Sequence, residues 1–249
     1  MKDRDLQDRL IRALADSGYR RSDEWLDGGL AEPERLERFA RFLARNFYRN
    51  RVIHFFKYSR ALARVTGRIP EHALDGPGFA AILPRAVLGS RETARAVAAL
   101  VGEELRAATG SDRVPYHADL LAYQEAMMVA EAGPRDWNGA EDRRVAPEAA
   151  AAEVVDGTTV LRLQNDLPSV LTALLAPWRE LPEAPRRPIR LLIARSRHGR
   201  VSVVILSDHM ERALALADGT RSLADLSKEA GGPVSDLLDL GAIRVSTGS

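Results

Sequence analysis

The chain has 249 residues, 45% of them hydrophobic, which is enough for two modest domains with cores of their own. It contains no cysteine, which excludes disulfides, thiolate metal sites and a cysteine nucleophile within these residues. Its 36 basic and 35 acidic residues leave a formal net charge of +1, and no apolar run approaches the length of a membrane span. The first thirty residues are charged and lack a signal-peptide core, so we expect a cytoplasmic protein.

Apolar residues recur at helical spacing throughout the first half of the chain. The spacing predicts helices over residues 6–17, 34–48, 51–67, 91–108 and 116–132. Ser90 is placed to cap the fourth of these helices, and Pro115 precedes the fifth. We therefore expect residues 1–135 to form an α-helical bundle.

Basic side chains are concentrated between Arg35 and Arg68, where ten bases accompany one acid, Glu37. Seven of the ten bases fall on two helical stripes, one of Arg38, Arg41, Arg45 and Arg49 and one of Arg60, Arg64 and Arg68. The first stripe lies opposite an expected apolar face of Phe39, Phe42, Leu43 and Phe47. The stripes are either a solvated surface or an electropositive surface that docks an acidic partner or peptide, with nucleic acid as a third possibility.

A segment that mixes glycine, proline, acidic residues and an alanine run predicts a linker over residues 136–153. In residues 154–249, the expected second domain, the hydrophobic period changes toward two. We expect a strand over 158–163, a short helix over Pro168–Leu175 and a proline-rich loop over 177–188. Two further apolar strands, 189–196 and 201–207, are joined by a turn at 197–200 and form a β-hairpin.

Capping signals predict three short helices after this hairpin. The first spans 208–218 with Gly219 as a left-handed C-cap, the second runs from Ser222 to the glycines at 231–232, and the third spans 233–240. The expected fold class is α+β. An N-terminal α-helical bundle is followed by a small winged-helix-like domain made of a β-hairpin plus three helices.

A winged-helix outline is typical of DNA-binding proteins, in which the third helix enters the major groove. Here that helix offers Ser235, Asp236 and Asp239 and no basic side chain. Between Ser207 and Ile243, seven acids stand against three bases, a net charge of −4, and phosphate contacts supply most non-specific DNA affinity. The charge argues against nucleic acid, and a DNA-binding transcriptional regulator is kept as the alternative function.

Catalytic and metal-binding motifs are few. The five histidines form no pair at metal-ligand spacing, and no phosphate-binding loop or serine-nucleophile motif is present. Tyr116, Tyr123 and Glu125 could form an acid–base group on one helix, although a helix that packs against its neighbours explains them more simply. We expect no enzyme activity, no metal and no cofactor in this chain.

Short motifs in both halves carry a family resemblance. In the first half they are RNFYRNR at 45–51, FKYSRAL at 56–62, the pair at 84–85, and VPYHADLL at 114–121 with Glu125 and Ala126. In the second half they are LRL at 161–163, LP at 167–168, Trp178, Pro188, LLIAR at 191–195 and ALADGT at 215–220. Together they resemble the HvfC-type partner proteins of multinuclear non-haem iron-dependent oxidative enzymes, over roughly residues 34–243. Gln124, where the family often has leucine, and the long linker depart from the pattern.

The resemblance implies a non-catalytic accessory subunit. In this family the second domain acts as a recognition element for a ribosomally made precursor or carrier peptide, and the helical domain clamps the iron-dependent enzyme, which holds the iron. The chain looks most similar to the partner subunit of thiaglutamate biosynthesis. There the iron enzyme excises a carbon from the C-terminal cysteine of a carrier peptide.

The residues suggest where such contacts would lie. An extended peptide can add as a strand to the exposed edge of the hairpin, and nearby arginines would favour an acidic leader. We expect the peptide to contact Arg195, Arg200, Val201, Val203 and Ile205. We expect the enzyme, in a heterodimer, to contact Arg49, Tyr58, Arg60 and Arg64.

Overall fold

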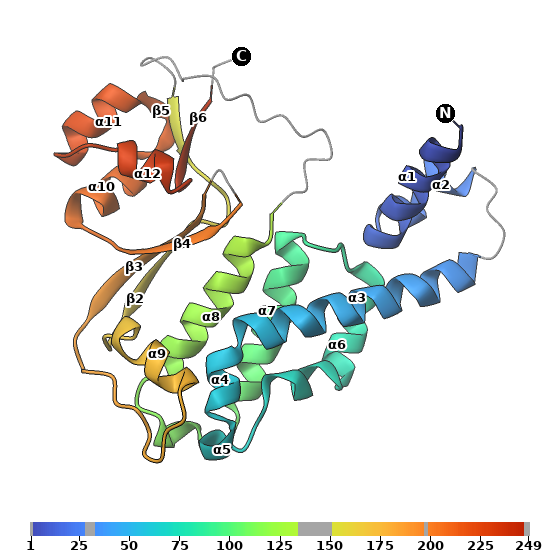
Figure 1. Ribbon diagram of the computed structural model, residues 1–249. Coiled ribbons are helices and arrows are strands. Elements are labelled where there is room, and N and C mark those ends of the chain that lie inside the picture. Colours follow the sequence, from blue (N-terminus) through green and yellow to red (C-terminus); the bar gives the residue numbers. More distant parts are fainter. Residues whose placement is uncertain (1, 28–32, 134–150, 197–198, 247–249) are drawn as a thin grey trace.

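The protein is described by a computed structural model that covers residues 2–27, 33–133, 151–196 and 199–246. Figure 1 shows a mixed α and β fold, in agreement with the expected α+β class. Two three-stranded antiparallel sheets are present among the described residues, and all of their strands come from the second half of the chain.

The first half of the chain is helical. Its helices are α1 (Lys2–Ala15), α2 (Asp23–Leu26), α3 (Pro33–Phe55), α4 (Lys57–Ala61), α5 (Ala63–Thr66), α6 (Pro77–Ile82), α7 (Arg91–Arg106) and α8 (His117–Glu131). Short 3-10 turns connect them at Tyr19–Arg21, Pro70–Leu74, Leu83–Arg85 and Ser111–Arg113. α7 packs along α8, and α3 crosses both helices and extends beyond them toward α1 (Figure 1). Ser90 caps α7 as predicted, because its hydroxyl accepts a hydrogen bond from the amide of Thr93 at 3.2 Å.

The boundary between the second and third expected helices was wrong. α3 continues without interruption to Phe55, and the chain leaves helical geometry at Phe56, where φ is −96° and ψ is 24°. A side chain from α8 stabilises the new helix that follows: the Oε1 atom of Gln124 accepts hydrogen bonds from the amides of Tyr58 and Ser59, each at 3.2 Å. Gln124 thus caps the N-terminus of α4 from outside that helix, a contact that local sequence signals cannot reveal.

The expected apolar face of α3 also needs correction. Its buried side chains are Ala40, Ala44, Tyr48, Val52 and Phe55. Phe39 and Phe42 are instead 49% and 57% exposed, and their rings are stacked with centroids 6.3 Å apart. Small alanines allow close helix packing, so the buried face includes two alanines, while Phe47 is the residue of the expected face that packs, partly buried, against the same core.

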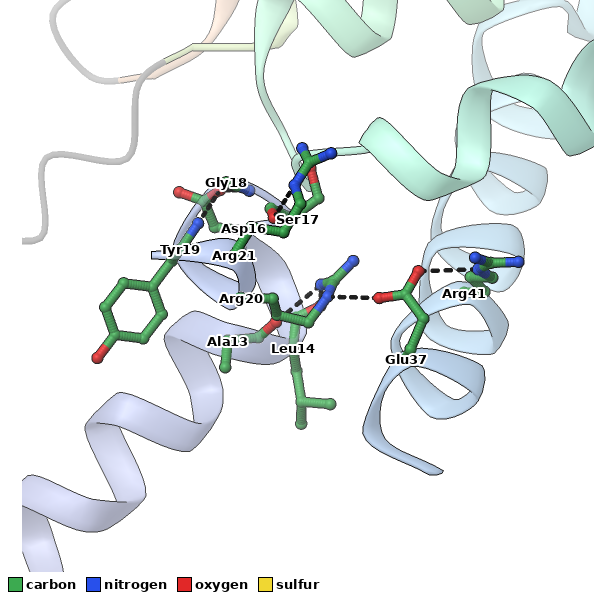
Figure 2. A network of polar contacts seen from close by, with 10 residues as sticks. All are labelled: Ala13, Leu14, Asp16, Ser17, Gly18, Tyr19, Arg20, Arg21, Glu37 and Arg41. Carbon is green, nitrogen blue, oxygen red and sulfur yellow. Dashed lines mark hydrogen bonds and ion pairs between the residues drawn. The ribbon is translucent and has the colours of Figure 1, made fainter. Parts of the chain in front are cut away.

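An ion-pair network attaches the N-terminal helices to α3 (Figure 2). Arg20, which is buried, donates from Nη1 to the carbonyl of Ala13 at 2.7 Å and from Nε to the carboxylate of Glu37 at 2.9 Å. Arg41 reaches the other oxygen of Glu37 at 2.8 Å. Burial alone would raise the pKa of Glu37, but hydrogen bonds from Arg41 and Arg20 outweigh it and lower the pKa below its ordinary value of 4.5.

This contact should make the attachment of the N-terminal helices pH dependent. Because the pKa of Glu37 is lowered on folding, its contribution to stability is present above pH 4.5 and is lost as the pH falls through the lowered value. The stability difference between wild type and Glu37→Gln should therefore shrink as the pH falls from about 5 to about 3, as measured by thermal unfolding. A difference that stays constant with pH would contradict this assignment.

The second half contains strands and short helices. They are β1 (Ala151–Val154), β2 (Thr159–Leu163), α9 (Pro168–Leu175), β3 (Ile189–Arg195), β4 (Val201–Ile205), α10 (Asp208–Leu216), β5 (Asp218–Ser222), α11 (Leu223–Ala230), α12 (Ser235–Asp239) and β6 (Ile243–Ser246). The predicted hairpin is confirmed as the antiparallel pair β3–β4, with Leu191 opposite Ile205, and α9 has the expected bounds. β2 pairs with the other side of β3, so the order in this sheet is β2-β3-β4.

The second sheet, in the order β5-β1-β6, was not predicted. The segment expected to end the first helix of the trio, around Gly219, is strand β5; Gly219 does adopt a positive φ of 84°, but the chain continues into a strand. β1 begins at Ala151, inside the expected linker, and pairs with both β5 and β6. The remainder of that linker, 136–150, and Arg197 and His198 of the hairpin turn lie outside the described residues.

The sheet β2-β3-β4 is a layer between the bundle and the C-terminal helices. On one face Leu163, Leu191 and Ile193 pack with Leu120 and Tyr123 of α8. On the other face Leu192 and Ala194 pack with a cluster that includes Met210, Leu226 and Leu237. The two halves of the chain therefore share this sheet.

Asp119 of α8 secures the same contact at the end of β2. Its Oδ2 atom accepts hydrogen bonds from the amides of Gln164 and Asn165, each at 2.9 Å, and from the side-chain amide of Asn165 at 2.7 Å. The loop between β2 and α9 is thus fixed to the bundle.

Candidate functional site

The outer edge of β4 is the first candidate site. Hydrogen bonds from Leu206 N to Arg190 O, at 2.9 Å, and from Ser196 N to Arg200 O, at 2.7 Å, mark hydrogen-bonded pairs at the two ends of the hairpin. Such pairs alternate along an antiparallel ladder, so residues 202 and 204 bond to β3. The amides and carbonyls of residues 201, 203 and 205 consequently point to the outer edge of the sheet.

The side chains of these three edge residues differ in exposure. Val201 and Val203 are half-buried against the cluster that contains Leu191 and Ile193. Ile205 is 68% exposed. The edge therefore combines outward backbone groups with an exposed apolar side chain at its end.

The two arginines expected at this edge have different surroundings. Arg195 lies directly opposite Val201 in the ladder, is half-buried, and donates from Nε to the carbonyl of Gly199 at 3.4 Å. Arg200 is exposed at the start of β4, and its amide donates to the Ser196 hydroxyl at 3.3 Å. The structure thus brings all five expected peptide-binding residues to one end of the hairpin or along its outer strand.

The four residues expected to contact an enzyme are not equivalent. Arg49 is exposed on α3, whereas Tyr58 is half-buried, with its ring centroid 6.5 Å from that of Tyr123. Arg60 forms an ion pair with Glu71, and Arg64 donates to the backbone carbonyl of Trp178. Only Arg60 and Arg64 of the four line a common groove.

Several arginines of the two basic stripes are already paired within the protein. Ion pairs join Arg38 to Glu34, Arg41 to Glu37, Arg60 to Glu71 and Arg68 to Glu104. These pairs reduce the positive potential below what the count of ten bases suggests.

The candidate acid–base residues of α8 contact different neighbours. Burial raises the pKa of Tyr123 to about 12, and its ring lies in the cluster shared with the sheet. Burial also raises the pKa of Glu125, an effect opposed by Arg106 of α7, with which it forms an ion pair. The structure therefore separates the two groups rather than joining them in one site.

Two kinds of feature are absent from the described part of the chain. No group of three or more histidine, aspartate or glutamate side chains there is arranged to hold a metal ion. None of the helices in that part is long and apolar enough to cross a membrane.

No protein-family model matches this sequence, and no curated protein matches it.

Proposed function

We propose that the chain is a non-catalytic subunit that binds a ribosomally made precursor or carrier peptide and presents it to an iron-dependent oxidative enzyme. The resemblance of its motifs to HvfC-type proteins suggests this role. The observation that carries the proposal is the β4 edge, where the backbone groups of Val201, Val203 and Ile205 face outward. An extended peptide could add there as a fourth strand, with main-chain hydrogen bonds for affinity and alternate side chains for specificity.

The arrangement of the C-terminal elements supports a winged-helix-like domain in this proposal. The order of elements there is helix, strand, helix, helix, strand, formed by α10, β5, α11, α12 and β6. β1 completes their sheet, while the β3–β4 hairpin belongs to the neighbouring sheet. The three helices would then serve as a scaffold, and the hairpin would bind the peptide.

Charge favours a peptide over DNA in this domain. α12 carries Asp236 and Asp239, and the exposed Arg200 lies beside the β4 edge. Acidic side chains of a leader peptide would be attracted to this arginine, whereas DNA phosphates would be repelled by α12. The modification itself, in a thiaglutamate-type pathway of the cytoplasm, would take place on a cysteine of the peptide in the active site of the partner enzyme.

The proposal can be tested against the DNA alternative by fluorescence anisotropy. We expect a labelled acidic precursor peptide, encoded beside the gene, to bind saturably, and labelled duplex DNA to bind weakly at about 200 mM salt. A transcriptional regulator would instead bind DNA tightly, lose affinity for it steeply between about 50 and about 200 mM salt, and bind no peptide.

A further inference from the structure

A groove of about 530 Å³ opens between α4 and α5 on one side and, on the other, the end of α9 with the residues that follow it. One wall carries Lys57, Arg60 and Arg64, and the other carries Leu175, Pro177 and Trp178. No acidic side chain is among the described residues that line it. The groove therefore combines three cations with an apolar wall, and part of that wall, Leu175, is 49% exposed.

Arg64 is held in place by the opposite wall. Its guanidinium carbon lies 3.3 Å from the centroid of the Trp178 ring, and the same group donates to the backbone carbonyl of Trp178. The indole is fixed in turn, because its Nε1 donates to the carbonyl of Leu174 at 3.2 Å. A guanidinium has five N–H donors in a rigid fork, so one hydrogen bond to a carbonyl leaves most of the fork available to a ligand.

Arg60 is held by a buried carboxylate. The Glu71 side chain is 7% exposed and pairs with Arg60, whose own side chain remains 51% exposed. Lys57 lies with its Nζ 5.1 Å from the Tyr58 ring centroid. Even with Glu71 counted, three cations against one carboxylate leave the groove with a net charge of +2.

We propose that this groove binds an acidic segment of the partner protein, with a carboxylate on Arg64 and Arg60 and a neighbouring apolar side chain on Leu175 and Pro177. Carboxylates match the guanidinium fork in a bidentate geometry, and arginine and tryptophan are enriched among the residues that contribute most to binding at protein interfaces. None of the described residues that line the groove belongs to the sheet, so a peptide added to the β4 edge leaves it free for a second protein, the partner enzyme.

The ligand chemistry can be tested on the full chain by NMR of the tryptophan indole groups, with the Trp178 signal assigned by its loss in Trp178→Phe. The probes are the tetrapeptides acetyl-LELE-amide and acetyl-LQLQ-amide. We expect the acidic peptide to shift the Trp178 signal saturably and to bind at least about tenfold more tightly than its amide analogue. Arg64→Ala should lose this difference. Arg68→Ala is the matched control, because Arg68 lies on the same stripe and is exposed like Arg64 but pairs with Glu104 outside the groove. An unshifted Trp178 signal, or equal affinity for both peptides, would overturn the inference.

The source of the segment is tested in the complex with the iron-dependent enzyme, and this step rests on the proposed function. Arg64→Ala should weaken binding of that enzyme at least about tenfold, and Arg68→Ala should not. Equal binding by wild type and Arg64→Ala would overturn the inference and leave the proposed function standing. If wild type itself binds no such enzyme, the proposed function is contradicted, and so is the inference that the acidic segment comes from that enzyme. The tetrapeptide experiment still decides whether the groove binds carboxylates.

Discussion

Replacing Gln124 by leucine should lower the free energy of unfolding by roughly 2–4 kcal/mol, because several buried polar groups lose their partners at once. Gln124 is completely buried. Its Oε1 atom accepts from the amides of Tyr58 and Ser59, and its Nε2 atom donates to the Ser59 hydroxyl at 2.6 Å and to the carbonyl of Leu120 at 3.3 Å. Leucine would leave the first turn of α4 uncapped within the core.

Urea denaturation measures this loss. Gln164→Leu is the matched control, since the Gln164 side chain is exposed and its stability change should be within about 0.5 kcal/mol. Adding Ser59→Ala to Gln124→Leu should recover part of the loss, because it removes one of the stranded groups. If Gln124→Leu is as stable as wild type, the break between α3 and α4 is held by packing around Phe56 and not by the amide.

Val203→Pro should weaken peptide binding by at least about tenfold without disrupting the hairpin. Its amide points away from β3, so proline removes a donor from the outer edge and none from the β3–β4 ladder. Val204→Pro is the matched contrast, because the amide of Val204 faces β3 and its loss should destabilise the sheet.

Anisotropy with the labelled precursor peptide, alongside urea denaturation of both variants, separates binding from folding. Only every second amide of an added strand faces β4. N-methylation of that set of peptide amides should weaken binding as Val203→Pro does, and N-methylation of the other set should not. Unchanged affinity in Val203→Pro would move the peptide away from the β4 edge.

The hairpin and α9 could be predicted from sequence because their signals are local. β3 and β4 are runs of apolar residues on either side of a turn, and Pro168 marks the start of α9. The three helices after the hairpin were located to within a few residues for the same reason: Ser222 caps α11, and Gly231 ends it with φ of 76°.

Elements that depend on distant partners could not be predicted. β1 and β5 are short strands with alanine, glycine and charged residues, and they exist because they pair with each other across about 70 residues of chain. The start of α4 after the break at Phe56 depends on Gln124, whose side chain accepts from the amides of Tyr58 and Ser59. The exposure of Phe39 and Phe42 depends on which face of α3 meets the rest of the bundle.

The candidate site, too, could be predicted where its signals are local and could not where they depend on distant residues. The edge residues Val201, Val203 and Ile205 could be named because alternation along a strand is visible in sequence. The groove could be named only in part: Lys57, Arg60 and Arg64 follow one another at helical spacing, but no local signal places Trp178, more than a hundred residues later, against Arg64.

The central claim is that this chain binds and presents a peptide and that a partner enzyme holds the iron. The most direct measurement is to purify the tagged chain from the organism that encodes it and to quantify protein subunits and iron before and after the complex is separated. We expect an equimolar complex with an iron-containing enzyme, and no iron on the chain once it is isolated. Stoichiometric iron on the isolated chain, or a purified chain accompanied by DNA and no such enzyme, would contradict the account.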